Sequence, residues 1–91
     1  MLWERGYERV TSREYNGSEY YLLVNEHLSY CKSEVRVQYV ICKINENNIR
    51  TNILINDKTF KKEEYTKNVR RNRRKAYKKK FFNYLDGLKL L

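Results

Sequence analysis

The sequence has no proline, one alanine, three glycines and two cysteines among its 91 residues. It also lacks any run of 18 consecutive apolar residues, which excludes a helix that spans a membrane. The first residues, 1–6, contain no apolar stretch and carry a glutamate, unlike a secretory signal. We therefore expect an intracellular protein with reduced thiols. The abundant Lys, Asn, Ile and Tyr have AT-rich codons, which indicates a low-GC bacterial, phage or viral source.

Residues suited to catalysis or metal binding are scarce. The single histidine, His27, precedes Cys31 by one helical turn, and Cys42 is the other cysteine. A structural zinc site takes four ligands, and no fourth His or Cys exists. Two aspartates and no Gly-rich loop leave little for a two-metal or nucleophilic site. We expect no enzyme, metal or cofactor, and a core position for Cys42; a Cys31–Cys42 disulfide stays open for an oxidising setting.

The formal net charge of +9 is confined to the C-terminal part of the chain. Residues 1–56 hold seven Lys or Arg and seven Glu, whereas residues 57–91 hold thirteen Lys or Arg and four acids. The length fits a single domain, 1–91, so a neutral module and a basic segment share one fold. Such an asymmetry favours a polyanionic partner and excludes an acidic mimic of nucleic acid.

The neutral module is predicted to form two antiparallel β-hairpins, at about 7–25 and 35–55. Asn16-Gly17 between two strand-like runs is a strong hairpin signal, because both residues accept positive φ. The two-residue loop predicts the pairs Tyr15–Ser18, Arg13–Tyr20, Thr11–Leu22 and Val10–Leu23.

In the second hairpin, a four-residue connector at 45–48 predicts the pairs Ile44–Ile49, Val40–Ile53 and Gln38–Ile55. Its first strand is apolar on both faces, which is typical of a central or doubly covered strand. A helix on one face and a partner on the other would fit that pattern. The link from Glu26 to Glu34 remains open as a loop, a helical turn or a short strand.

The basic segment is predicted to form one long helix, at about 58–86, with Asp57 or Thr59 as its N-cap. Tyr65, Val69 and Ala76 form one apolar stripe, and a second stripe is rotated from it by roughly 120°. The second stripe consists of Tyr77, Phe81, Tyr84, Leu85 and Leu88. The rotation predicts a helix that winds round its support or breaks near 73–77, with the intervening arginines turned away from the core. The expected fold class is α+β, with a small sheet packed on this helix through Tyr65, Val69, Phe81 and Leu85.

A dense cationic run is the main candidate site. It comprises Arg70, Arg71, Asn72, Arg73, Arg74, Lys75, Lys78, Lys79 and Lys80. Like charges one helical turn apart repel, and a phosphate backbone relieves that repulsion through ion pairing and counterion release. Arginine offers a planar fork to phosphates or guanine, and asparagine can read a base edge. A solvated surface or a targeting signal remains an alternative explanation.

The run Val69-Arg70-Arg71-Asn72-Arg73-Arg74-Lys75 resembles the arginine-rich RNA-binding motifs of lentiviral export regulators and lambdoid phage antiterminators. In the former, a helical Arg-Arg-Asn-Arg-Arg enters a widened RNA major groove. The resemblance implies that Asn72 reads bases, flanked by Arg70, Arg71, Arg73 and Arg74. It covers only this run and nothing upstream.

The nine tyrosines offer a second, smaller surface. Arg9, Arg13 and Tyr20 are expected to share one face of the first hairpin, where an exposed ring would stack on unpaired bases. The favoured interpretation is that most tyrosines are core or rim residues with the hydroxyl at the surface.

These features predict a small non-enzymatic nucleic-acid-binding protein, with RNA slightly favoured over DNA. One alternative is a phage or viral effector that inhibits an acidic host protein or nucleoprotein machine by direct contact. Another is peripheral membrane binding by the basic helix, with Phe81, Phe82, Tyr84 and 85–91 as the apolar part.

Overall fold

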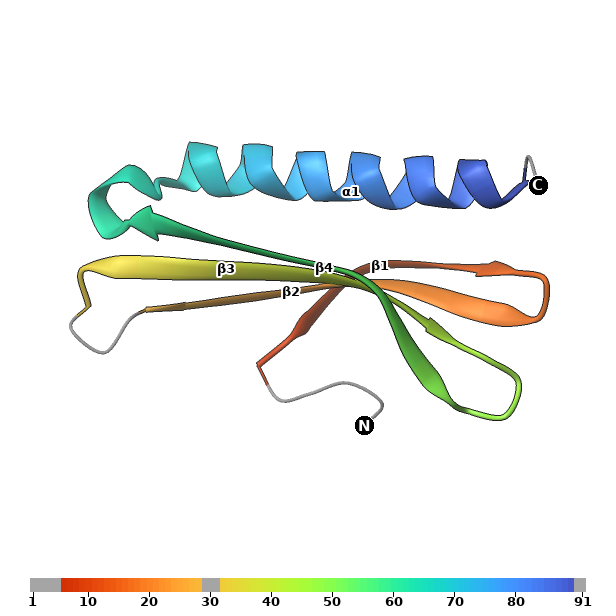
Figure 1. The fold of residues 1–91 in the computed structure, drawn as a ribbon. Coiled ribbons are helices and arrows are strands. Elements are labelled where there is room, and N and C mark those ends of the chain that lie inside the picture. Colours follow the sequence, from red (N-terminus) through yellow and green to blue (C-terminus); the bar gives the residue numbers. More distant parts are fainter. Residues whose placement is uncertain (1–5, 29–31, 90–91) are drawn as a thin grey trace.

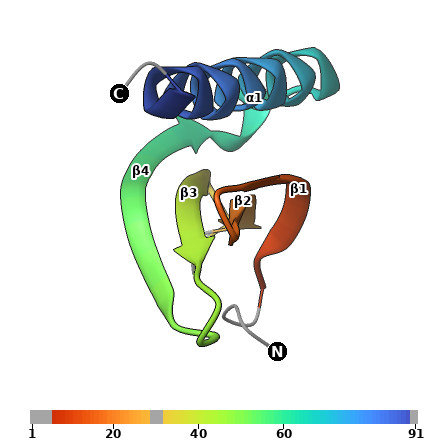
Figure 2. The same cartoon turned by 90° about the vertical axis from the view of Figure 1, so that its right-hand side faces the viewer.

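The computed structural model describes residues 6–28 and 32–89. Four antiparallel strands form one sheet in the order β1-β2-β3-β4, and a single long helix follows them. The elements are β1 (Glu8–Tyr15), β2 (Ser18–Leu28), β3 (Glu34–Ile44), β4 (Arg50–Lys61), the 3-10 turn η1 (Lys62–Glu64) and α1 (Lys67–Lys89). Figure 1 shows α1 lying along one face of the sheet, and Figure 2 shows β4 curving round beside it. The predicted α+β class is confirmed.

The first hairpin forms at the predicted turn. Asn16 and Gly17 both have positive φ, 51° and 79°, as a type I′ turn requires. The predicted pairs next to the turn are confirmed, as far as Thr11 opposite Leu22. The pair Val10–Leu23 is wrong, because the register shifts at Val10 and Arg9 lies opposite Leu23 instead. A bulge places one extra residue in a strand and reverses the alternation beyond it.

The turn of the second hairpin is one residue longer than predicted. Asn45 Oδ1 accepts hydrogen bonds from the backbone N–H groups of Asn47 and Ile49, both at 3.0 Å. These bonds hold Ile49 in the turn, so Ile44 pairs with Arg50 and not with Ile49.

A second shift follows between Ile41 and Cys42, where Ile53 is the extra residue of β4. Val40 therefore pairs with Ile55, and Gln38 pairs with Asp57. The predicted pairs Val40–Ile53 and Gln38–Ile55 were therefore wrong. Neither the longer turn nor the bulge has a signal in the pattern of apolar and polar residues along the strands.

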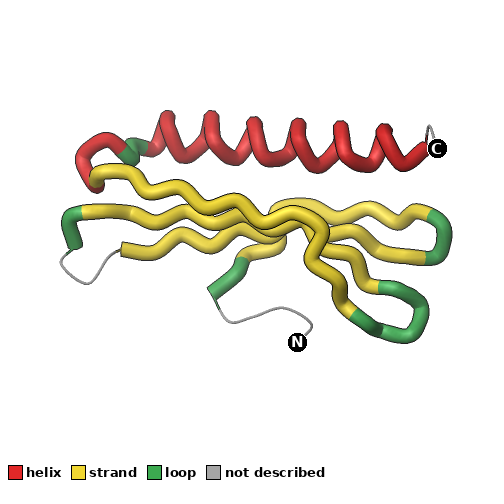
Figure 3. Tube along the Cα trace, viewed as in Figure 1, coloured by secondary structure: helices red, strands yellow, loops and turns green. Residues whose placement is uncertain are grey.

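The strands form a meander in which each pairs with the next along the chain, as Figure 3 shows. The segment from Glu26 to Leu28 belongs to β2, and β3 begins at Glu34. The described part of the open link is thus mainly strand. Strand β3 lies between β2 and β4, as its two apolar faces predicted.

The main core lies between the sheet and α1. Tyr77, Phe81 and Leu85 are the buried residues of the helix, and the Tyr77 ring stacks on Tyr39 with centroids 4.2 Å apart. The predicted contacts of Phe81 and Leu85 are confirmed. Tyr65 also packs on this core, from just before the helix, whereas Val69 is only half-buried.

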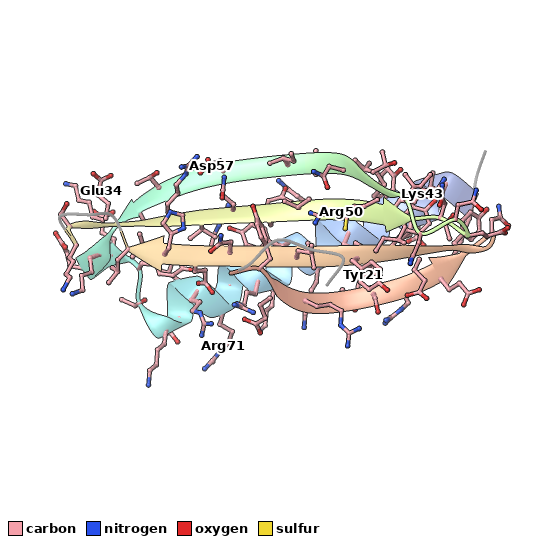
Figure 4. All side chains as sticks on the ribbon, turned by 90° about the horizontal axis from the view of Figure 1, so that it is seen from below. Tyr21, Glu34, Lys43, Arg50, Asp57 and Arg71 are labelled. Atoms are coloured by element: carbon pink, nitrogen blue, oxygen red, sulfur yellow. The ribbon has the colours of Figure 1, made fainter. Side chains whose placement is uncertain are left out.

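A second apolar cluster lies on the other face of the sheet. It contains Tyr21, Leu23, Val40, Cys42 and Ile44, with Tyr7 packed against it. Figure 4 views this face. The core position expected for Cys42 is confirmed, since its side chain is fully buried. Cys31 lies outside the described residues, as do the disulfide and metal site that would need it.

The helix begins nine residues later than predicted. Residues 58–61 continue β4, where Phe60 lies opposite Val35 and its ring packs 5.1 Å from Tyr65. Asp57 and Thr59 are therefore strand residues, and the predicted N-caps were wrong.

Thr66 caps the helix instead. Its Oγ1 accepts from the backbone N–H of Val69 at 3.3 Å, and its carbonyl accepts from Arg70 N–H at 2.9 Å. From Lys67 to Lys89 the helix is continuous, so the break expected near 73–77 does not occur. No helix in the described ranges is long and apolar enough to cross a membrane.

Phe81 tests the contact between helix and sheet. Replacing this fully buried ring by alanine leaves a cavity, so we expect Phe81→Ala to lower the free energy of unfolding by about 3–5 kcal/mol. Urea denaturation followed by circular dichroism measures the change. Asn83→Ala, on the exposed side of the same helix, is the matched control and should change it by less than about 0.5 kcal/mol. Equal effects of the two substitutions would contradict this packing.

Candidate nucleic-acid interface

The cations of α1 divide into two sets according to the side of the helix they occupy. The helix holds ten Lys or Arg and one acid, Asp86. At 3.6 residues per turn, Arg70, Arg73 and Arg74 continue the stripe of Tyr77 and its buried neighbours toward the N-terminus. They face the sheet, contrary to the expectation that the arginines point away from the core.

A single carboxylate of β2, that of Glu26, holds two of these inward arginines. Arg70 Nε donates to its two oxygens at 3.1 and 3.0 Å, and Arg74 Nη2 donates at 2.6 Å. Tyr65 adds a hydrogen bond from its hydroxyl to the same carboxylate. Arg74 Nη2 also lies 3.0 Å from Glu8 of β1. The Glu26 cluster (Glu26, Glu8, Tyr65, Arg70, Arg74) therefore joins the N-terminal half of α1 to the sheet.

The environment of Glu26 favours its charged form. Burial alone would raise the pKa of this carboxyl, but the hydrogen bonds from Tyr65, Arg74 and Arg70 outweigh burial and lower the pKa below its ordinary value. Burial and the same carboxylate raise the pKa of the Tyr65 hydroxyl. Only 16% of the Glu26 side chain is exposed, so its ion pairs are shielded more than ordinary surface pairs.

Arg73 contacts aromatic rings instead of an acid. Its guanidinium carbon lies 5.2 Å from the ring centre of Tyr77 and 5.8 Å from that of Phe60. Its Nε donates to the Tyr77 hydroxyl at 3.4 Å. Cation–π contacts of this kind stabilise a partly desolvated guanidinium. Arg73 therefore packs between α1 and β4.

Four of the remaining candidates form an exposed stripe along one flank of the packed side of the helix. This stripe, here called the outer stripe, consists of the exposed residues Arg71, Lys75, Lys78 and Lys79. Asn72 is exposed as well. Within the described ranges, no acid lies at ion-pair distance from any of these four cations. Figure 4 shows Arg71 projecting beyond the β1 side of the sheet. Lys80 is exposed as well, with its Nζ 5.8 Å from the Tyr39 ring centre.

The secondary surface expected on the first hairpin does not form. Tyr20 is buried under α1, at 5% exposure, with its ring 6.2 Å from Tyr84. Arg13 shares that face and lies 5.0 Å above the ring of Phe82. The bulge at Val10 turns Arg9 to the other face, so the three residues are not brought together.

The described tyrosines belong to the core or its rim, as the favoured interpretation predicted. Tyr20, Tyr21, Tyr39 and Tyr77 are buried, and Tyr7, Tyr15, Tyr65 and Tyr84 are half-buried. Tyr30 lies outside the described residues.

Part of the site was not predicted from the sequence. The first two turns of α1 border a cavity of about 330 Å³ lined by Lys67, Arg70, Arg71 and Arg74. Lys67 was not among the predicted residues, nor were the counter-ions Glu8 and Glu26. A helical wheel would have grouped the four cations, since they recur at three- and four-residue spacing, but the acids come from distant strands.

Glu26 tests whether one carboxylate holds the basic helix. Glu26→Gln removes the charge that Arg70 and Arg74 share, so we expect unfolding at pH 7 to cost about 2 kcal/mol less. Because the folded state lowers the pKa of Glu26, its contribution is full above the unfolded value of about 4.3 and is lost as pH falls through the folded value. The difference between wild type and variant should therefore shrink below about pH 4. Denaturation between pH 3 and 8 measures it.

The exposed Glu63→Gln is the matched control for the loss of one negative charge. A pH-independent difference for Glu26→Gln, or an equal effect of Glu63→Gln, would contradict the role of the Glu26 cluster.

Within the described residues, no three His, Cys, Asp or Glu side chains come together as the ligands of a metal ion would. Comparisons of the chain with protein-family models, with curated proteins and with solved structures find no match.

Proposed function

We propose that this protein is a non-enzymatic nucleic-acid-binding protein that grips phosphates with the outer stripe of α1. The observation that carries the proposal is the exposure of Arg71, Lys75, Lys78 and Lys79 on one side of a helix, without acidic partners among the described residues. A surface that serves only solubility carries charges of both signs. This side of the helix carries no acidic residue before Asp86. A nucleic-acid partner agrees with an intracellular site of action.

The packing of α1 prepares the stripe for binding. Tyr77, Phe81 and Leu85 fix the helix along the sheet, and the Glu26 cluster fixes its first turns. A rigid array loses less conformational entropy on binding than a flexible tail does. At 1.5 Å per residue, α1 is about 35 Å long, close to one turn of a duplex. Counterion release from the contacted phosphates then supplies the affinity.

The arginine-rich motif acts only in part in this arrangement. Arg71 and Asn72 project outward, whereas Arg70, Arg73 and Arg74 are engaged on the sheet side. Base reading falls to Asn72, and phosphate contacts dominate, so we propose modest sequence specificity. RNA is placed ahead of DNA on the resemblance of this motif.

A protein-binding function is favoured by a different surface. The outer edge of β4 pairs with no strand in the described ranges and carries the exposed Leu54 and Ile55, at 42% and 58% exposure. An extended segment of a partner protein can add to such an edge. This is the surface that the effector alternative would use.

Most of the apolar residues that peripheral membrane binding would use are packed on the sheet. Phe81 and Leu85 lie in the core with 0% and 5% exposure, and Tyr84 is half-buried. The apolar side of α1 is thus packed on the sheet, and 90–91 lie outside the described residues.

The salt dependence of binding tests the outer stripe. Four to five phosphate contacts predict that the logarithm of the association constant falls with the logarithm of salt concentration with a slope of about −4 on a duplex. We expect the triple variant Arg71→Gln, Lys75→Gln and Lys79→Gln to reduce this slope by about 3. Fluorescence anisotropy with matched RNA and DNA duplexes, at several salt concentrations, measures it.

The matched control removes the same charge away from the helix, at Lys32, Lys43 and Lys61, and should change the slope by less than about 1. A flat salt dependence of the wild type would refute nucleic-acid binding. Equal losses in the two variants would show that net charge, and not the outer stripe, carries the affinity.

A further inference from the structure

The cavity beside the first two turns of α1 is lined, among the described residues, by cations alone. Lys67, Arg70, Arg71 and Arg74 all border it. The cluster is electrostatically costly, because its members lie one turn apart and Lys67 stands in the first turn, where the helix dipole already disfavours a cation. Lysine and arginines in this arrangement are stabilised by an anion that enters between them.

The protein's own acids leave this cavity with an unbalanced charge. Glu26 and Glu8 pair with Arg70 and Arg74, whereas no acid in the described ranges pairs with Lys67 or Arg71. The four cations and two carboxylates together carry a net charge of +2. The lining thus has two cations, Lys67 and Arg71, without an acidic partner among the described residues.

We propose that this cavity binds the terminal phosphate monoester of a nucleic-acid strand, an inference that rests on the proposed function. A monoester carries about −1.5 to −2 charge at neutral pH and three terminal oxygens, which match the charge of the lining and its guanidinium donors. An internal phosphodiester carries one charge and is esterified on both sides, so it satisfies this lining less well. Arginine forks suit phosphate oxygens, and Lys67 adds a mobile point charge.

The position of the cavity agrees with a strand end. Arg71 belongs both to the cavity and to the outer stripe, which continues from it through Lys75 to Lys79 over about 12 Å of helix. A strand held along the outer stripe reaches the cavity at one end of that stripe. There the helix begins, and the outer stripe ends at Arg71. The strand's own terminus is the group that this end can receive.

The experiment compares duplexes of one sequence in which one strand differs only at its ends. Fluorescence anisotropy is measured at constant salt for strands with a 5′-phosphate, a 3′-phosphate or hydroxyls at both ends. We expect one phosphorylated end to bind about tenfold more tightly than the hydroxyl-ended strand, the equivalent of about 1.4 kcal/mol. Equal affinities of all three strands would overturn the inference, whereas failure of every strand to bind would refute the proposed function itself.

Two single variants separate the cavity from the outer stripe. Lys67→Gln should abolish the tenfold preference and leave the hydroxyl-ended strand within about twofold of wild type. It removes a cation from the positive end of the helix dipole, so the fold is not destabilised. Lys75→Gln is the matched control and should weaken all strands alike, with the preference retained. An unchanged preference in Lys67→Gln would overturn the assignment of the cavity.

Inorganic phosphate distinguishes a strand end from a free ion as the ligand. We expect it to compete with the phosphorylated strand only at concentrations that disturb the hydroxyl-ended strand equally, because the free ion makes no contacts with the outer stripe. Selective displacement of the phosphorylated strand by dilute inorganic phosphate would show that the cavity takes the free ion, and would overturn the assignment to a strand terminus.

Discussion

A helix that carries ten cations can lie against a sheet only if its inward cations find compensation there. Glu26 supplies most of it, since one carboxylate accepts from Arg70, Arg74 and Tyr65. Further along the helix, the inward side carries Tyr77 and Phe81, which are buried by apolar packing on the sheet and need no counter-ion. Both kinds of contact lie on one side of the helix, and the cations that take no part in them remain exposed. The exposed stripe is thus a consequence of how the helix is held.

The fold class, the first turn and the central position of β3 could be predicted because each has a local signal. Asn16-Gly17 accepts the positive φ of its turn, and the alternation in β3 shows two apolar faces. The end of β4 has no such signal. Residues 57–61 are polar apart from Phe60, and pairing with β3 outweighs their helical propensity. The bulges at Val10 and Ile53 also depend on neighbouring strands, which a single-strand pattern does not contain.

For the candidate site, composition identified the cations but not their directions. The stripe of Tyr77, Phe81 and Leu85 continues into Arg74 and Arg70 at helical spacing, so their inward direction could have been read from the helix period alone. The compensating acids could not, because Glu26 lies 44 and 48 residues from Arg70 and Arg74, and Glu8 lies 66 residues from Arg74. Contacts over such separations follow from the topology of the sheet rather than from any local pattern.

The meander has a consequence for the order in which the protein is assembled. Every strand pairs with its neighbour in sequence, so the sheet contains only short loop closures and forms progressively as the ribosome releases the chain. The cationic helix emerges after the four strands and meets a template on which Glu8 and Glu26 are already in place. Synthesis from the N-terminus therefore offers Arg70 and Arg74 their carboxylate partners as soon as the helix emerges, whereas the outer stripe stays exposed.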